Sequence, residues 1–236
     1  MCQAAPLNNM AATDKLRTMC RGVWARIRYE RNRVKQQDDQ DQDDQEVEQK
    51  FCVPRDYQQT LQSHGASLKS VKSLVDEYLD TVSLTLLQRD VWCRKRGDKW
   101  ELKIPPEGLK HGRESAGMTQ YREVVGKTDV AEEVMKISDT SLEDLTRLVL
   151  VEATRETWIL EDYTIIIDTL EDGWSVGEIE LMTSAGKNIE SVKQRIQALG
   201  EQLNFEPLMY GKVRYLLEKQ NHPAVKILRA VSGDIK

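Results

Sequence analysis

The sequence predicts a mainly β fold with peripheral helices (α+β), organised as an eight-stranded antiparallel β-barrel that forms a tunnel. From residue 46 onward, polar and apolar residues alternate in eight short runs, which is the periodicity of half-buried strands. Turn sequences such as Gly97-Asp98 and EDG at 171–173 join neighbouring runs, which indicates antiparallel hairpins. Eight such strands favour a closed barrel over a sandwich, because closure removes the exposed sheet edges.

The amino-terminal residues differ in charge from the rest of the chain. Residues 1–35 carry eight Lys or Arg against Asp14 and Glu30, a net charge of +6, and their apolar residues recur at helical spacing. This pattern predicts a basic amphipathic extension, which is compatible with a mitochondrial presequence, a membrane-surface segment or a helix that docks on the body. Residues 36–45 (QQDDQDQDDQ) have no apolar side chain and predict a disordered acidic linker. Residues 46–236 are expected to form the tunnel domain.

The first half of this domain contains four of the predicted strands. The run EVEQKFCV alternates polar and apolar residues and is ended by Pro54, which predicts a strand over 46–53. A short helix is expected at 57–63, followed by strands at 68–78, 90–96 and 99–104. The last two of these strands form a hairpin around the Gly-Asp turn.

The second half begins with a loop at 105–117 that is rich in Gly and Pro. Strands are predicted at 118–124, 148–159, 163–170 and 174–183, with a helix at 130–137 between the first two. A helix at 187–203 and a final helical region from 211 to the end, broken at Pro223, complete the expected elements.

Composition excludes several classes of protein. With 39% hydrophobic and 31% charged residues, the 236-residue chain fits a soluble globular domain, and no apolar run approaches the roughly 18 residues that a transmembrane helix needs. The four cysteines lie far apart, which indicates reduced thiols in an intracellular compartment: cytoplasmic or, if residues 1–35 are a presequence, mitochondrial. A net charge of −5 does not suggest nucleic acid as a partner, and a monomer is expected.

Charged residues alternate along several of the predicted strands. Because successive side chains of a strand point to opposite faces, residues two apart share one face. The residues that share faces in this way are Glu46, Glu48 and Lys50; Trp92, Arg94 and Arg96; Tyr121 and Glu123; and Glu178 and Glu180, with Lys103 and Arg155 on two further strands. A single polar strand face usually contacts solvent. In a closed barrel, however, these faces would look inward at one another.

A barrel interior that holds charges of both signs is costly unless ligands compensate them. The carboxylates would suit a divalent cation and the bases a polyanion, which together match a metal-chelated triphosphate. The three histidines lack zinc-ligand spacing, so carboxylates are the candidate ligands, and hard oxygen ligands select Mg²⁺, Mn²⁺ or Ca²⁺. Gly186-Lys187 lacks the first glycine of a phosphate-binding loop, and no GxSxG nucleophile motif is present.

The ordered charged motifs resemble a known family. They are Glu46, Glu48 and Lys50 (EVEQK), Tyr78 (YLDT), Trp92, Arg94 and Arg96 (WCRKR), Trp100 and Lys103 (WELK), Tyr121 and Glu123 (YRE), Arg155, Asp168, Glu178 and Glu180 (GEIE), and Lys212. Over about residues 45–220 the sequence is similar to the CYTH superfamily, also called triphosphate tunnel metalloenzymes, and within it to the animal thiamine triphosphatases. The order and spacing of so many charged positions make the resemblance specific.

The resemblance implies Mg²⁺-dependent hydrolysis of thiamine triphosphate to thiamine diphosphate and phosphate inside the tunnel. It implies as metal ligands Glu46, Glu48, Asp168, Glu178 and Glu180, with Mn²⁺ as an alternative ion. The implied substrate-binding bases are Lys50, Arg94, Arg96, Lys103, Arg155 and Lys212. The implied catalytic residues are Lys50, Lys103, Glu123 and Tyr78.

Trp92 is the residue on which the choice of substrate depends. Its ring is expected to face the tunnel beside the phosphates and to stack on a cationic thiazolium, the alternative being an aromatic residue of the core at the barrel mouth. Similar tunnels hydrolyse inorganic triphosphate or cyclise ATP, so an inorganic triphosphatase and, less favoured, an adenylate cyclase are alternative functions. Ile166 and Leu79 depart from the family pattern, which leaves open a catalytically silent binder of phosphorylated metabolites.

Overall fold

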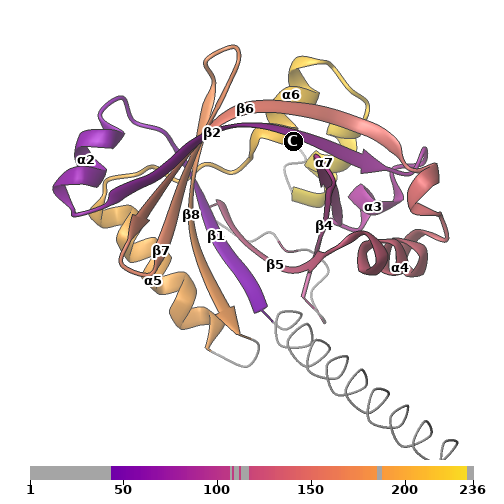
Figure 1. The fold of residues 1–236 in the computed structure, drawn as a ribbon, viewed down its shortest axis with the longest axis horizontal. Helices are drawn as coiled ribbons and strands as arrows, with labels where there is room; N and C mark the ends of the chain where they lie inside the picture. Colours follow the sequence, from indigo (N-terminus) through magenta and orange to yellow (C-terminus); the bar gives the residue numbers. More distant parts are fainter. Residues whose placement is uncertain (1–43, 107, 109–111, 113–116, 185–187, 233–236) are drawn as a thin grey trace, which may run out of the picture. The chain divides into compact units, whose positions relative to one another are not determined.

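The computed structural model describes residues 44–106, 108, 112, 117–184 and 188–232, and the strands in these ranges close into one barrel (Figure 1). Around the barrel the strands follow the order β1-β5-β4-β3-β2-β6-β7-β8, and each neighbouring pair is antiparallel. The predicted eight-stranded antiparallel barrel is therefore confirmed. The predicted extension at 1–35 and the predicted linker as far as residue 43 lie outside the described residues.

The strands begin and end close to their predicted boundaries. They are β1 (Asp44–Cys52), β2 (Ser67–Asp80), β3 (Trp92–Arg96), β4 (Lys99–Ile104), β5 (Met118–Val125), β6 (Thr146–Leu160), β7 (Tyr163–Leu170) and β8 (Ser175–Ser184). The sequence predicts that the third strand starts at Asp90, but β3 starts two residues later. Asp90 has a φ of 55°, and this left-handed conformation cannot continue a strand.

The hydrophobic core lies between the outside of the barrel and the helices that cover it. On β1, Val47 and Phe51 are fully buried in the same apolar cluster as Ile196 of α5 (Ile189–Gln202). Glu46 and Glu48, which alternate with them, line a cavity inside the barrel. The strand period of two thus sends apolar side chains outward to the helices and charged side chains inward.

The remaining helices cover the barrel on other sides. They are α2 (Tyr57–Ser63), α3 (Thr85–Gln88), α4 (Lys127–Ser138), the 3₁₀ helix η2 (Leu142–Asp144), α6 (Lys212–Lys219) and α7 (Ala224–Ser232). The predicted break of the last helical region at Pro223 separates α6 from α7. The sequence does not predict α3 or η2, because four and three residues are too few for a helical period to be recognised.

Two further observations bear on the predicted class of protein. Cys52 and Cys93 are free thiols, as their spacing in the sequence predicts. In the part of the chain that the structure describes, no helix has both the length and the apolar character needed to cross a bilayer.

Candidate functional site

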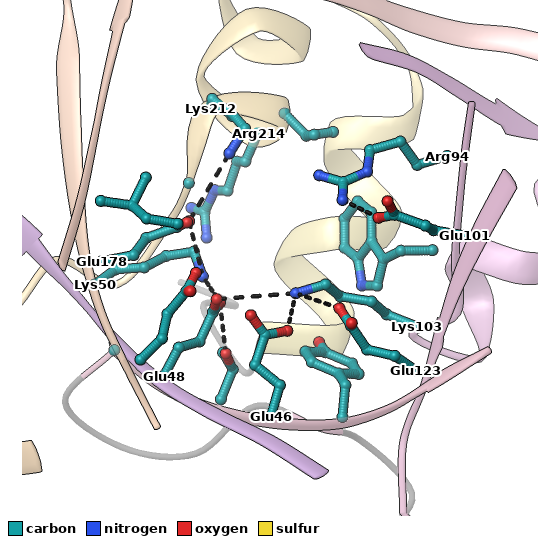
Figure 2. Close-up of a pocket in the computed structure, with 18 of the residues that line it drawn as sticks. Glu46, Glu48, Lys50, Arg94, Glu101, Lys103, Glu123, Glu178, Lys212 and Arg214 are labelled. Carbon is teal, nitrogen blue, oxygen red and sulfur yellow. Dashed lines mark hydrogen bonds and ion pairs between the residues drawn. The ribbon is translucent and has the colours of Figure 1, made fainter. Parts of the chain in front are cut away.

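A cavity of about 290 Å³ inside the barrel brings the predicted charged residues together (Figure 2). All eight strands and the start of α6 contribute to its wall. The ionisable side chains that line it are six carboxylates (Glu46, Glu48, Glu101, Glu123, Glu178 and Glu180) and six bases (Lys50, Arg94, Lys103, Arg155, Lys212 and Arg214). On β1, β3, β4 and β8 the lining residues are two positions apart, so they share the inward face.

Three carboxylates meet where β1 and β8 pair. Glu48 and Glu180 are register partners, and carboxylate oxygens of Glu46, Glu48 and Glu180 lie within 4.8 Å of one another. Within the described ranges, Glu180 forms no ion pair with a base. Burial raises the pKa of Glu180 well above its usual value, and the carboxylates of Glu46, Glu178 and Glu48 raise it further. We call these three residues the acidic corner.

The acidic corner fits a divalent cation. Its donors are carboxylate oxygens from two neighbouring strands, and such hard oxygen donors suit Mg²⁺, Mn²⁺ or Ca²⁺. Glu46 and Glu48 are 7% and 5% exposed, so water screens their mutual repulsion poorly. A cation would therefore relieve the electrostatic cost that this arrangement carries.

Two lysines border the acidic corner. Lys103 pairs with Glu46, and its Nζ lies 3.3 Å from Glu123 Oε1. Lys50 pairs with Glu48. Burial alone would lower the pKa of Lys103, but the carboxylates of Glu46, Glu48 and Glu123 hold it well above its usual value. Both amines therefore stay cationic, and they lie beside the carboxylates that would bind a metal ion.

Asp168 holds two of the cavity's bases. It is fully buried, its Oδ1 and Oδ2 each accept a hydrogen bond of 2.7 Å from Arg155, and Oδ2 lies 2.7 Å from Lys212 Nζ. Burial alone would raise the pKa of Asp168, but Lys212 and Arg155 hold it below its usual value. Asp168 does not line the cavity, and both of its oxygens are engaged by bases. The sequence analysis predicts Asp168 as a metal ligand, whereas the structure places it outside the cavity and in contact with two bases.

Asp76, on β2, has the same arrangement as Asp168 on β7. Its carboxylate is 1% exposed and binds Arg94 at 3.3 Å and Arg96 at 2.7 Å. Arg94 also pairs with Glu101 and lines the cavity. Arg96, predicted to grip phosphate, shares the inward face but does not line the cavity, because it lies farther along β3 with its guanidinium on Asp76. We call Asp76 and Asp168, with the two bases that each holds, the paired clamps.

Glu178 lies between Lys50, which borders the acidic corner, and Lys212, which pairs with Asp168. Its Oε1 lies 3.5 Å from Lys50 Nζ and 3.9 Å from Lys212 Nζ. Burial alone would raise the pKa of Glu178, but Lys212, Lys50 and Arg155 hold it below its usual value. The structure therefore places this predicted metal ligand among the bases, next to the acidic corner.

An aromatic wall adjoins the charged part of the cavity. Trp92 is the register partner of Lys103, and Tyr78 meets its ring edge-on, with 6.3 Å between the centroids and 88° between the planes. Both rings line the cavity together with Tyr121. The predicted inward orientation of Trp92 and Tyr78 is thus observed, and it places an aromatic surface next to the bases of the cavity.

Several residues that line the cavity or hold its bases are absent from the sequence prediction. Glu101 shares a strand face with Lys103, and Asp76 shares one with Tyr78, so the same alternation would have identified them. Thr119 donates a 2.8 Å hydrogen bond to Glu48 Oε1 but carries no charge. Arg214 reaches the cavity from α6, where no strand alternation applies.

Comparisons with known proteins agree with this fold. The CYTH domain family model matches residues 44–208. The human protein thiamine-triphosphatase is 26% identical over 183 residues, which cover 67% of this chain and 76% of the human one. The PH1819 protein of Pyrococcus horikoshii OT3 superposes with a TM-score of 0.55 at 17% identity, covering 74% of this chain and 99% of that one. The putative adenylyl cyclase HpAC1 from Hippeastrum, described as having a dominant triphosphatase activity, gives 0.50 at 15% identity, covering 77% and 98%.

Proposed function

Because this chain belongs to the CYTH domain family, we propose that it is a divalent-metal-dependent hydrolase that converts thiamine triphosphate to thiamine diphosphate and phosphate. One observation carries this proposal: the acidic corner, the bases and Trp92 line the same cavity. Each of these three features matches one part of the substrate complex, which consists of a metal ion, a polyphosphate and an aromatic cation.

The balance of charge in the cavity supports a metal requirement. Six carboxylates face six bases, so a polyanion that entered alone would have to compete with carboxylates for every base. A cation held by the acidic corner would change this balance, because Glu48 and Glu46 would then bind the cation in place of Lys50 and Lys103. The freed amines would bind phosphate oxygens instead.

We assign the metal to Glu46, Glu48 and Glu180, with Mg²⁺ as the ion and Mn²⁺ as a substitute. When bound, such an ion would supply a Lewis acid that draws charge from the phosphate oxygens. The chain itself would orient the triphosphate through Arg94, Arg155 and the lysines. These bases also stabilise the charge that develops on the leaving oxygen as water attacks the terminal phosphorus in line.

We assign proton uptake from that water to Glu123. It lines the cavity 3.3 Å from Lys103, and its side chain is 27% exposed, the most open of the carboxylates around that amine. It is not one of the three residues assigned to the metal, so it would remain available to take up the proton. Tyr78 lines the cavity from β2, where its hydroxyl would orient the substrate.

The aromatic wall supports an organic triphosphate over an inorganic one. Trp92 presents its ring to the cavity next to Lys103, at the position where the ester end of a bound triphosphate would lie. A thiazolium cation over the indole face gains cation–π attraction. The charged part of the cavity alone would also bind inorganic triphosphate, so an inorganic triphosphatase is the second candidate function.

The test is phosphate release from thiamine triphosphate, inorganic triphosphate and ATP, each with Mg²⁺ and with a chelator. We expect Mg²⁺-dependent release and a kcat/KM at least about tenfold higher for thiamine triphosphate than for inorganic triphosphate, the size of one good cation–π contact. A preference for inorganic triphosphate of the same size would contradict the thiamine assignment and select the second candidate.

A further inference from the structure

A buried carboxylate that does not line the cavity connects two of its aromatic residues. Asp90 lies two residues before β3, is fully buried and has a left-handed backbone with a φ of 55°. Aspartate and asparagine adopt this conformation more readily than other residues with a side chain. A buried carboxylate is costly unless hydrogen-bond donors surround it, so its partners indicate its role.

Three hydrogen-bond donors to Asp90 in the described part of the chain come from different segments. Its Oδ1 accepts a 3.0 Å hydrogen bond from Trp92 Nε1. Its Oδ2 accepts one of 2.8 Å from the Tyr121 hydroxyl and one of 2.9 Å from the backbone N–H of Gly112. Trp92 and Tyr121 both line the cavity, whereas Asp90 lies behind them.

We propose that Asp90 is a positioning residue for substrate specificity: it fixes Trp92 and Tyr121 as one wall and makes that wall selective for a cationic organic group. This inference rests on the proposed function and deepens it. The ligand class is a phosphate ester whose organic part is a planar cation, in contrast to an inorganic polyphosphate or an ester with a neutral ring.

The first part of the effect is orientation. An indole whose N–H is held by a carboxylate cannot turn about its outer side-chain torsion without breaking a charge-assisted hydrogen bond. The same carboxylate holds the Tyr121 hydroxyl, so the two rings keep a fixed relation to each other. Binding then costs less conformational entropy, because both rings are already in place.

The second part of the effect is electrostatic. A cation is attracted to the face of an aromatic ring by the ring's negative potential. A full negative charge at the N–H edge of the indole adds to that potential, and the buried position of Asp90 limits its screening by water. A cationic ring gains from this charge, whereas a neutral ring or a bare phosphate does not.

Gly112 explains how the third donor reaches the carboxylate. A Cβ at this position would lie 2.4 Å from the carbonyl oxygen of Gln120 and 2.5 Å from the ring of Tyr121. Only glycine can therefore pack this closely against Tyr121 while its N–H points to Asp90.

The test compares Asp90→Asn with the matched control Asp80→Asn. Asparagine keeps the size and the tolerance for a left-handed backbone but removes the charge and turns one acceptor into a donor. Asp80 is also a buried carboxylate, and it accepts backbone N–H groups from Thr81, Leu86 and Leu87 at the start of α3. None of these hydrogen bonds involves Trp92, Tyr121 or Tyr78, so Asp80→Asn reports the effect of losing a buried carboxylate elsewhere in the fold.

We expect Asp90→Asn to lower kcat/KM for thiamine triphosphate by about tenfold through KM, and to change kcat/KM for inorganic triphosphate by less than about twofold. Tyr121→Phe removes one donor and keeps the ring. It is expected to lower the ratio of kcat/KM for thiamine triphosphate to kcat/KM for inorganic triphosphate, by a smaller factor than Asp90→Asn. Asp80→Asn is expected to lower Tm and leave the substrate ratio unchanged. Equal losses of Asp90→Asn on both substrates would overturn the inference, as would an unchanged ratio.

A binding measurement separates this inference from the proposed function. Calorimetric titration with thiamine diphosphate and with pyrophosphate needs no turnover. If the wild type hydrolyses neither triphosphate, the proposed function fails. The Asp90 inference then still requires that Asp90→Asn weaken thiamine diphosphate binding by about tenfold while pyrophosphate binding stays within about twofold. Loss of both affinities to the same extent, or of neither, contradicts it.

Discussion

The acidic corner and the paired clamps are built in opposite ways from the same residue types. In the acidic corner three carboxylates lie together, and Glu180 forms no ion pair among the described residues. In the paired clamps, Asp76 and Asp168 each bind two bases. Removing a partner from a buried matched pair is destabilising, whereas removing one of several like charges relieves repulsion. The difference separates carboxylates that position other residues from carboxylates that bind a ligand.

This contrast explains why a stable protein keeps an unfavourable cluster. A site that binds a cation needs negative charge that no resident base neutralises, and that charge costs stability while the site is empty. The paired clamps need no ligand, because each buried carboxylate is already compensated. Function is therefore expected to depend on both regions, but stability should respond to them with opposite signs.

The largest effect is expected from Glu48→Gln, which removes one carboxylate of the acidic corner. Mg²⁺-dependent turnover should fall by about 10²–10³-fold, because the remaining pair of carboxylates holds the cation poorly. Phosphate release measured across a Mg²⁺ titration checks this. Glu152→Gln, an exposed acid on β6, is the matched control and should keep full activity. Turnover of Glu48→Gln within about threefold of wild type would contradict the assignment of the acidic corner as a ligand-binding cluster.

Asp168→Asn should damage both activity and stability. Arg155 and Lys212 would lose the carboxylate that orients them, so turnover should fall by roughly 10²-fold. The free energy of unfolding should fall by about 3–5 kcal/mol, because two buried bases are left without their partner. Urea unfolding followed by circular dichroism measures the second quantity. A variant as stable as wild type would show that Asp168 belongs with the ligand-binding carboxylates after all.

A smaller effect should distinguish the two arginines held by Asp76. Arg94→Lys is expected to lower kcat/KM by about tenfold, because lysine cannot reproduce the planar fork of an arginine that lines the cavity. Arg96→Lys should cost less than about threefold, since Arg96 does not line the cavity. Steady-state kinetics on the same substrate compare them directly. Equal losses would restore Arg96 to the phosphate-binding set.

The smallest expected effect is on the stability of the fold at low pH. Burial alone would raise the pKa of Asp76, but Arg96 and Arg94 hold it below its usual value of 3.8. A carboxylate with a lowered folded-state pKa stabilises the fold above its unfolded pKa, and this stability is lost as the pH falls through the folded value. Asp76→Asn should therefore be less stable than wild type at pH 7 by about 1–3 kcal/mol. Below pH 3.8 the difference should shrink; a difference that stays constant with pH would contradict the ion-pair account.

Strand alternation was enough to predict which residues face inward, but not how deep along the barrel each one lies. Glu46, Glu48, Lys50, Trp92 and Arg94 all line the cavity, as their spacing predicts. Arg96 and Asp168 share the inward faces of their strands yet lie beyond the cavity, because depth depends on strand stagger and on buried partners elsewhere in the chain. No local pattern in the sequence encodes either of these quantities.

Residues outside the strands were the hardest to predict. Arg214 enters the cavity from a helix, and Asp90 reaches Trp92 and Tyr121 from a left-handed turn. Neither position follows a period of two, and the partners of Asp90 are up to 31 residues away. Their roles depend on tertiary packing that composition and spacing do not reveal.

Thermal unfolding of wild type and Glu180→Gln, each with and without Mg²⁺, tests the central claim most directly. Without metal, Glu180→Gln should unfold at a higher Tm than wild type, because it removes one of three crowded carboxylates. Mg²⁺ at about a hundred times its Kd should raise the wild-type Tm by roughly 5–10 °C and leave the variant nearly unmoved. A wild type that does not respond to Mg²⁺, or a variant that is less stable without metal, would contradict the assignment of the acidic corner as the metal site.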